Sequence, residues 1–429
     1  MSTPLIIAIV IFILAFILKM PIALGMIASG AFYFMLSDIR LGLQQIASSM
    51  GNMIFSSYVL IAVPLFILSA NIMNSGKITN MIFKFANALV GRRHGGLGHV
   101  NVLASLIFSG MTGSAIADAS GLGKMEIAAM REAGYDDAFS CAITSASATI
   151  GPIFPPSIPM VIYAMYSNTS VGELFLGGTI PGIMLALSLA IYVSIVAKKR
   201  NYPRGEKLPM RDFLVFAFKA IPALLTPVIL LIGIYTGVMT PTEAGAVAGL
   251  YALIISILFY RSMGIVEFIK VIKQSVLDVG GISIMVAAAS VISYIVAREQ
   301  IAVGLANFVL GITNSQFVFL TVSSLIIIIL GMFVDTSVIQ FVFIPMLLPL
   351  ASSLGVNLLH FGVLTTLNMM IGLSTPPFGM LLFITSNISG TELKDIIQEN
   401  WYPLIAMFIV LILVTYFPIF STYLPSLIK

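Results

Sequence analysis

Two proline-broken segments of the chain could present backbone and hydroxyl oxygen atoms to a small cation. Residues 150–156 read IGPIFPP and residues 371–377 read IGLSTPP, so the two segments lie 221 positions apart. Proline lacks a backbone N–H and disfavours helix in the residue before it, so each break leaves carbonyl groups without a helical partner. Inside a membrane such groups persist only where they are buried in protein or line a cavity. Carbonyl and hydroxyl oxygens suit a hard cation such as Na⁺, which makes both breaks candidate ion sites.

A glycine-rich segment precedes each break at the same spacing. Residues 109–114 read SGMTGS and residues 331–336 read GMFVDT, with Gly110 and Gly331 again 221 positions apart. Small residues at one such segment could simply allow close helix packing. Two of them at one offset favour a different interpretation, in which each segment is the tip of a re-entrant hairpin that faces a break. Paired interruptions in two apolar halves are typical of secondary transporters built from a structural repeat.

Charged residues inside apolar segments form a second group of candidates. Asp118 and Asp335 lie at or just after the two tips, Glu243 follows a Thr-Pro-Thr helix break, and Arg298 with Glu299 interrupts an apolar stretch. A charge at the centre of a membrane helix costs at least about 2.5–3.5 kcal/mol, so each needs a partner or a function. The guanidinium of Arg298 could bind a substrate carboxylate through two hydrogen bonds. Two structural alternatives stay open: Arg298 and Glu299 could reach water at the interface, and Asp118 could hold its hairpin to the rest of the protein.

Composition places the chain in the membrane. Of 429 residues 59% are hydrophobic and 9% are charged, far from the values of soluble domains. Apolar runs, mostly long enough to cross a bilayer, predict about ten to twelve crossing segments and occupy 4–18, 20–36, 57–72, 176–197, 213–238, 244–260, 281–296 and 401–418. The single cysteine excludes an internal disulfide, the three histidines are scattered, and no phosphate-binding GxxxxGK[ST] loop occurs. We therefore expect neither an enzyme nor an ATP-driven pump, and the net charge of +4 does not indicate nucleic-acid binding.

Basic residues orient the predicted segments. Lysines and arginines crowd residues 198–211, which the positive-inside rule places in the cytoplasm. The same rule makes 100–123 a hairpin that enters from inside and 317–350 a hairpin that enters from outside, so the repeat is inverted. The predicted organisation is a first repeat at 1–200 with scaffold helices at 1–75 and a core at 98–170, a cytoplasmic linker at 201–212, and a second repeat at 213–429 with scaffold helices at 213–300 and a core at 317–390.

Four shorter patterns complete the predicted elements. Ser170–Glu173 and Ser389–Glu392 fit the S-x-x-E capping box and predict helix starts. Residues 41–55 and 262–279 mix polar and apolar positions and predict helices that lie along the membrane surface. Such helices could brace a fixed scaffold.

Motifs along nearly the whole chain resemble the large membrane subunit of TRAP transporters, the tripartite ATP-independent periplasmic transporters. These motifs are VPLFIL at 63–68, GLGHVNV at 96–102, GSAIAD at 113–118, IGPIFPPS at 150–157, TPTEA at 240–244, GMFVDT at 331–336, HFGV at 360–363 and IGLSTPP at 371–377. The resemblance implies an all-α polytopic protein of the bacterial inner membrane, with an ion-transporter-type elevator fold, inverted repeats, two re-entrant hairpins and two broken helices. It also implies Na⁺-driven uptake of a carboxylated substrate delivered by a periplasmic binding protein. A separate small four-helix membrane subunit and membrane lipids are the other implied partners.

The resemblance further implies two Na⁺ sites and a set of transport residues. The first Na⁺ site lies between the tip residues Ser109, Gly110 and Ser114 and the break from Gly151 to Ser157, including Phe154. The second lies between Gly331 and the break from Gly372 to Thr375, with a carbonyl contribution from Phe378. Because Ile153 and Phe154 stand where the second break has Ser374 and Thr375, the first site must rely more on carbonyl groups. Positions associated with transport are Ser114, Asp118, Glu243, Arg298 and Asp335.

The substrate and the dependence on partners stay open at this point. Sialic acid and C4-dicarboxylates are the leading candidates, with a preference for sialic acid from general resemblance. The alternative function is a stand-alone Na⁺/dicarboxylate carrier that needs no binding protein. An intramembrane enzyme and a passive channel are weaker alternatives, because no nucleophilic or metal pattern stands out and a channel would not explain a need for Na⁺.

Overall fold

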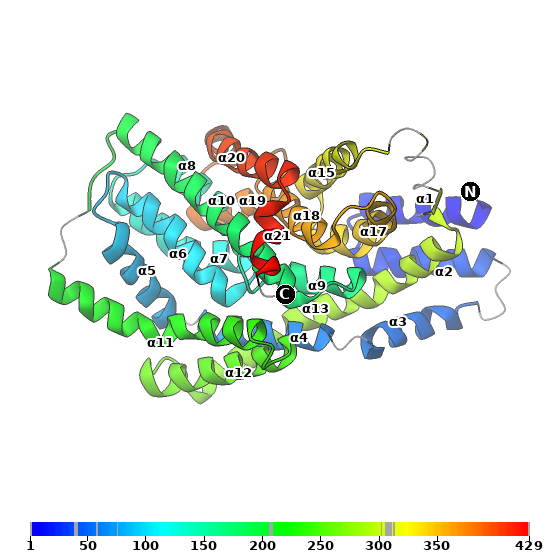
Figure 1. The fold of residues 1–429 in the computed structure, drawn as a ribbon, viewed down its shortest axis with the longest axis horizontal. Coiled ribbons are helices and arrows are strands. Elements are labelled where there is room, and N and C mark those ends of the chain that lie inside the picture. Colours follow the sequence, from blue (N-terminus) through cyan, green and yellow to red (C-terminus); the bar gives the residue numbers. More distant parts are fainter. Residues whose placement is uncertain are drawn as a thin grey trace.

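The chain folds into packed helices that include two helical hairpins and two interrupted helices (Figure 1). This computed structural model describes residues 2–37, 42–56, 59–74, 76–205, 209–301, 303–304, 311 and 314–427. The N-terminal helices lie at one end of the long axis, and the C-terminus lies near the middle of the view (Figure 1). The predicted all-helical class is confirmed for the part of the chain that the structure describes.

The first half contains one hairpin and one broken helix. Its helices are α1 (Thr3–Ile17), α2 (Ile22–Leu36), α3 (Gln44–Ser56), α4 (Val59–Met73), α5 (Gly76–Val90), α6 (Gly96–Thr112), α7 (Ala115–Glu132), α8 (Asp137–Ala148), α9 (Ile158–Ser167) and α10 (Val171–Lys199). Helices α6 and α7 form the first hairpin, with its tip at Gly113 and Ser114. Helices α8 and α9 are separated by residues 149–157, which we call the first break.

The second half repeats this order. Its helices are α11 (Met210–Tyr235), α12 (Pro241–Ile254), η1 (Ile255–Phe259), α13 (Ile265–Arg298), α15 (Gln316–Phe333), α16 (Thr336–Val338), η2 (Ile339–Phe343), α17 (Ile344–Ser353), α18 (Leu358–Leu373), α19 (Met380–Ser389), α20 (Leu393–Tyr416) and α21 (Ile419–Ser426). The second hairpin runs from α15 to α17, with its tip at Val334 and Asp335. The second break, residues 374–379, separates α18 from α19. Each break contains one cis peptide bond, at Pro155–Pro156 and Pro376–Pro377.

Two sets of helices pack mainly among themselves. Helix α13 packs against α2, α3 and α4, and α4 packs against α12. In the other set α7 packs on α8 and α19, α15 on α18, and α20 on α8, α10 and α18. Helices α4, α5, α11 and α13 connect the two sets through contacts with α6, α9 and η2. The division of the chain into scaffold and moving core stays a prediction.

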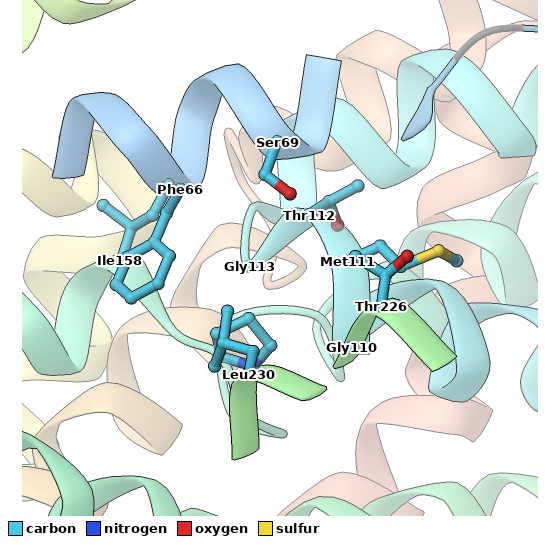
Figure 2. A pocket seen from close by; sticks show the side chains of 10 residues that line it. Phe66, Ser69, Gly110, Met111, Thr112, Gly113, Ile158, Thr226 and Leu230 are labelled. Atoms are coloured by element: carbon cyan, nitrogen blue, oxygen red, sulfur yellow. The ribbon is translucent and has the colours of Figure 1, made fainter. Parts of the chain in front are cut away.

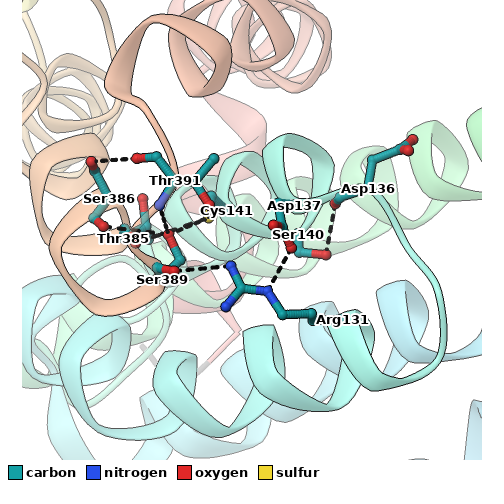
Figure 3. Close-up of polar contacts among 9 residues, drawn as sticks. All are labelled: Arg131, Asp136, Asp137, Ser140, Cys141, Thr385, Ser386, Ser389 and Thr391. Carbon is teal, nitrogen blue, oxygen red and sulfur yellow. Dashed lines mark hydrogen bonds and ion pairs between the residues drawn. The ribbon is translucent and has the colours of Figure 1, made fainter.

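Polar contacts from α7 and α8 to α19 tie the first half of the chain to the second (Figure 3). Arg131, near the end of α7, donates to the carboxylate of Asp137 at 2.6 Å and to the carbonyl oxygen of Ser389 at 2.9 Å. The thiol of Cys141 donates to the hydroxyl of Ser389 at 3.1 Å. The last turn of α19 is therefore held by α7 and α8.

Three details differ from the sequence predictions. Residues 265–279 do not form a separate surface helix, because α13 runs without interruption for 34 residues. Ser389 does not begin a helix: it is the last residue of α19, and α20 begins at Leu393 with Glu392 as its N-cap. Among the described residues seven helices are long and apolar enough to cross a membrane, or eight if the bent pair α4 and α5 is one span. This is fewer than ten to twelve, because several apolar segments form helices of 10–17 residues.

Candidate functional site

The tip of the first hairpin is a tight turn pressed against the first break. Gly113 has φ 59°, and a Cβ atom there would lie 2.6 Å from the carbonyl oxygen of Pro156, so glycine is needed for both conformation and space. Ser114 is the N-cap of α7, and its hydroxyl accepts from the backbone N–H of Ala117 at 3.4 Å. The predicted contact between this tip and this break is present.

The first break is rich in oxygen acceptors and poor in donors. Pro152, Pro155 and Pro156 contribute no backbone N–H. Ser157 is the fully buried N-cap of α9, where its hydroxyl accepts from the N–H of Met160 at 3.2 Å and donates to the carbonyl oxygen of Pro152. Such a segment offers neutral oxygen atoms, and its binding of a cation stays a prediction.

The second tip contacts the second break through backbone atoms. A Cβ atom on Gly372 would lie 2.8 Å from the Cα of Gly331, and one on Gly331 would lie 3.0 Å from the Cα of Gly372. The N–H of Gly379 donates to the carbonyl oxygen of Met332 at 3.3 Å. Asp335 is the N-cap of α16, where its carboxylate accepts from the N–H of Ser337 at 2.8 Å.

The hydroxyl groups of the second break are already positioned by neighbours. Thr375 donates to the carbonyl oxygen of Ile371 at 2.6 Å, and the hydroxyls of Ser374 and Ser145 lie 3.1 Å apart. The carbonyl oxygen of Ser374 accepts from the Asn400 side chain at 2.5 Å. The break is thus fixed between α8 of the first half and α20 of the second.

One cavity of about 190 Å³ brings together the two hairpin tips, the first break and the C-terminal end of α18, which leads into the second break. Its walls include Ser114 and Asp335, which occupy equivalent positions 221 residues apart, and Pro152 and Leu373, which are related by the same offset. Helices α9 and α13 complete the walls, the latter through Ile282. The repeat seen in the sequence therefore converges on a single chamber in space.

The outer side of the first tip is packed against α4 and α11 (Figure 2). Phe66 and Ser69 of α4 and Thr226 and Leu230 of α11 surround Gly110–Gly113 and leave a gap of only about 10 Å³. That space is close to the minimum for one water molecule. The first hairpin tip therefore fits closely against α4 and α11.

Several predicted site residues lie elsewhere. Asp118 is buried on α7 behind the tip, and neither of its carboxylate oxygens has a hydrogen-bond partner within the described residues. Glu243 is exposed and completes a capping box with Thr240, whose N–H donates to it at 2.8 Å. Arg298 ends α13 in an exposed position, outside the cavity. Phe378 is 55% exposed and its ring packs beside those of Phe333 and Phe383.

Two polar residues of the cavity, Ser337 and Gln340, were not predicted from the sequence. Thr336 and Ser337 follow the second tip, and Gln340 lies one turn further along η2, where its side chain donates to the carbonyl oxygen of Pro159 at 2.7 Å. The sequence signal that could have identified Gln340 is its position as a glutamine within an otherwise apolar arm of the second hairpin. Its counterpart at the 221-residue offset is Ala119, so a search for matched pairs passes over it.

Long apolar helices, two hairpins and two broken helices define a multi-pass helical membrane protein with a cavity between its hairpin tips. A family model described as "Tripartite ATP-independent periplasmic transporter, DctM component" matches residues 8–420. The chain belongs to this family. It is a multi-pass transport protein of the bacterial inner membrane, not an enzyme.

Curated relatives and a solved structure agree with this assignment. The chain is 41% identical to the sialic acid TRAP transporter large permease protein SiaM of Vibrio cholerae, over 95% of each chain. It is 38% identical to the sialic acid TRAP transporter permease protein SiaT of Haemophilus influenzae, over 100% of this chain and 69% of that one. It is 38% identical to the C4-dicarboxylate TRAP transporter large permease protein DctM of Pseudomonas aeruginosa, over 86% of each. The Alcanivorax borkumensis YdaH transporter has a similar fold, with a TM-score of 0.62 at 13% identity over 90% of this chain and 91% of that one.

Proposed function

We propose that this TRAP large permease imports an organic acid by Na⁺ symport and that the substrate is sialic acid. The observation that carries the proposal is the convergence of both hairpin tips, the first break and the C-terminal end of α18 on one cavity. Unwound carbonyl groups and helix ends at the midplane are where secondary transporters bind substrate and coupling ions. Sialic acid comes first because SiaM and SiaT, relatives at 41% and 38% identity, carry that substrate in their names. C4-dicarboxylates are the second candidate, from the 38% identical DctM.

The residues present suit two Na⁺ ions. At the first site Ser109 donates its hydroxyl proton to the carbonyl oxygen of Leu106 at 2.6 Å, so the oxygen keeps lone pairs for a cation. Gly110, Ser114 and the break from Gly151 through Phe154 to Ser157 would supply the other oxygens. At the second site Thr375 likewise donates to a carbonyl and keeps lone pairs. Carbonyls of Gly331, Gly372 and Phe378 would complete that site.

Asp335, beside the second site, is the only acidic residue among the described residues that line the cavity. Asp335 lines the chamber and caps α16, whereas the equivalent Ser114 is neutral. A bound cation beside Asp335 would offset its charge within the membrane. Moving one net charge through 100 mV is worth about 2.3 kcal/mol, so each additional Na⁺ increases the concentrating power of transport.

Movement of the core along α13 would explain the position of Arg298. Ile282 of α13 lines the cavity, and Arg298 lies 16 residues later on the same helix, which corresponds to about 24 Å of helix. The positive-inside rule places the basic linker in the cytoplasm. From that orientation we place the Arg298 end of α13 at the outer face of the membrane. In an elevator mechanism the chamber would approach Arg298 in its outward position, where the guanidinium would meet the substrate carboxylate. Glu243 would act through the start of α12, which it caps, and Asp118 through the buried interior of the first hairpin.

The complete transporter would contain two further proteins. A periplasmic binding protein would deliver the substrate, and a small membrane subunit would join this chain. The test is uptake of radiolabelled sialic acid into proteoliposomes that contain both membrane subunits, with and without a Na⁺ gradient and the binding protein. Accumulation that needs both supports the proposal. Uptake without the binding protein would support a stand-alone carrier, and uptake of a C4-dicarboxylate alone would change the substrate.

Arg298 offers a sharper test of substrate recognition. Arg298→Ala should abolish uptake while the purified complex stays folded, and Arg298→Lys should recover part of it because a point charge remains but the two-pronged geometry is lost. Glu299 gives a neighbouring control, since its carboxylate is occupied by the hydroxyls of Ser2 and Tyr33, each at 2.7 Å. Normal transport by Arg298→Ala would exclude the assigned role.

A further inference from the structure

A groove between α10 and α20 lies outside the candidate site and shares no lining residue with it. It has a volume of about 470 Å³ and is lined mainly by apolar side chains. Ile191 and Ile195 of α10 and Ile405 and Ile409 of α20 form its walls and are each more than half exposed. Tyr192 and Ala406 lie between them. In a chain that crosses the membrane, such a surface is available to lipid tails.

The depth of the groove corresponds to one leaflet. On α10 it extends from Ser188 to Arg200, which is about 18 Å of helix. Half of the hydrocarbon core of a bilayer is about 15 Å. A single acyl chain that enters from one leaflet would therefore follow the full length of the groove.

Cationic and aromatic side chains mark the cytoplasmic end. Lys199 and Arg200 line the groove at the end of α10, next to the basic linker that the positive-inside rule places in the cytoplasm. Trp401 and Tyr402 are 52% and 55% exposed at the same level of α20, as in the aromatic belts of membrane proteins. This end therefore lies at the height of the lipid headgroups.

The two cations at the groove differ in their freedom to bind a ligand. Arg200 donates to both carboxylate oxygens of Glu399 at 2.8 Å and to Asp136 at 3.1 Å. Lys199 is exposed and forms no ion pair within the described residues. The lysine ammonium is thus available at the mouth of an apolar groove, while Arg200 holds α10 to α20.

We infer that this groove binds an anionic phospholipid of the cytoplasmic leaflet, with one acyl chain between the isoleucine walls and the phosphate at Lys199. Basic pockets between membrane helices on the cytoplasmic side are suited to acidic headgroups. The occupant is distinct from the transported substrate, because the groove shares no lining residue with the central cavity.

The test measures retained lipid on the purified complex of this chain with its small membrane subunit. After delipidation in detergent, the complex is titrated with phosphatidylglycerol or phosphatidylcholine, and bound lipid is counted by native mass spectrometry. We expect preference for phosphatidylglycerol. Lys199→Gln should weaken its binding about fivefold, as expected for one lysine near an anionic surface, and leave phosphatidylcholine unchanged. Ala406→Leu should reduce binding of both lipids by filling the groove.

Lys270→Gln is the matched control, because Lys270 is an exposed lysine in the first part of α13 and is remote from the groove. Equal binding of the two lipids, or equal loss with Lys199→Gln and Lys270→Gln, would overturn the inference. A rise in phosphatidylglycerol binding after removal of the small subunit would also overturn it, because the groove would then be a subunit contact.

Discussion

The two hairpin–break pairs share a backbone plan but use it against different neighbours. In the second pair Gly331 and Gly372 press their backbones together, so that a Cβ atom added to either would lie only 2.8–3.0 Å from the opposing Cα. In the first pair the equivalent residues separate: a Cβ on Gly110 would lie 2.9 Å from the side chain of Pro227 on α11, while a Cβ on Gly151 would meet its nearest atom at 3.2 Å. Gly331 and Gly372 thus allow the second hairpin to contact α18 closely, whereas Gly110 allows the first hairpin to contact α11.

In this protein the repeated motif keeps the same course of the chain in both halves, but its residues contact different neighbours. Both tips place an N-cap residue in the same cavity, Ser114 in one half and Asp335 in the other. The first tip is enclosed by α4 and α11, whereas Phe333 and Phe378 beside the second tip are 51% and 55% exposed. We therefore expect equivalent substitutions in the two pairs to have unequal effects.

The largest effect should come from alanine at Gly372, the glycine near the end of α18 that contacts the second hairpin. Gly372→Ala forces a methyl group into the backbone of Gly331 and should destabilise the protein by about 1–3 kcal/mol and reduce uptake more than tenfold. Gly151→Ala, the matched change in the first break, should retain most activity because its neighbours can shift by a few tenths of an ångström. Thermal unfolding and initial uptake rates measure both. Equal losses would show that the two breaks pack alike.

A smaller effect should separate charge from capping at the tips. Asp335→Asn keeps the N-cap of α16 and should leave stability unchanged, yet reduce Na⁺-dependent uptake because the carboxylate is lost. Asp335→Ala should lose the cap as well, at about 0.5–2 kcal/mol. Ser114→Ala removes the equivalent cap but no charge, so a modest loss is expected. The measurement is uptake against Na⁺ concentration, and wild-type behaviour of Asp335→Asn would remove the charge from the mechanism.

A still smaller effect should test the attachment of the first hairpin to α11. Gly110→Ala brings a methyl group against Pro227 and should slow transport severalfold, while Na⁺ still stabilises the protein against heat. Thr226→Ala, in the same wall (Figure 2), provides a control that adds no volume. The backbone carbonyl proposed to bind Na⁺ is kept in Gly110→Ala, so loss of Na⁺ stabilisation would show that the contact with Pro227 also sets the geometry of the ion site.

The smallest effect is expected at the contact between α7 and α19. Arg131 and Asp137 are about half exposed, and exposed ion pairs contribute about 0–1 kcal/mol. Arg131→Ala should therefore lower stability by less than about 1 kcal/mol, with uptake nearly unchanged. A loss as large as that of Gly372→Ala would mean that the bond from Arg131 to the Ser389 carbonyl governs the position of α19.

Much of the fold was predictable because glycine, proline and apolar length act locally. The predicted tips at 109–114 and 331–336 contain the observed tips, and the predicted breaks at 150–156 and 371–377 overlap the observed breaks at 149–157 and 374–379. Paired prolines interrupt the helix at both breaks, whereas Pro64 and Pro227 lie inside continuous helices. The start at Ser389 and the separate helix at 262–279 were wrong. The polar pattern at 262–279 does not show whether the helix continues beyond it. Ser389 instead accepts hydrogen bonds from Arg131 and Cys141, which lie in a distant part of the chain.

The sequence by itself determined that this is a multi-pass membrane protein with two related halves, because apolar length and a 221-residue repeat of Gly and Pro are properties of the chain alone. Only the tertiary structure decided which of the repeated residues meet. Ser114 and Asp335 share one chamber, whereas Arg298 lies at the far end of α13 and Glu243 caps its own helix. Spacing along a chain fixes direction and equivalence, but side chains from distant segments meet only where helices pack, and packing depends on every residue at the interface.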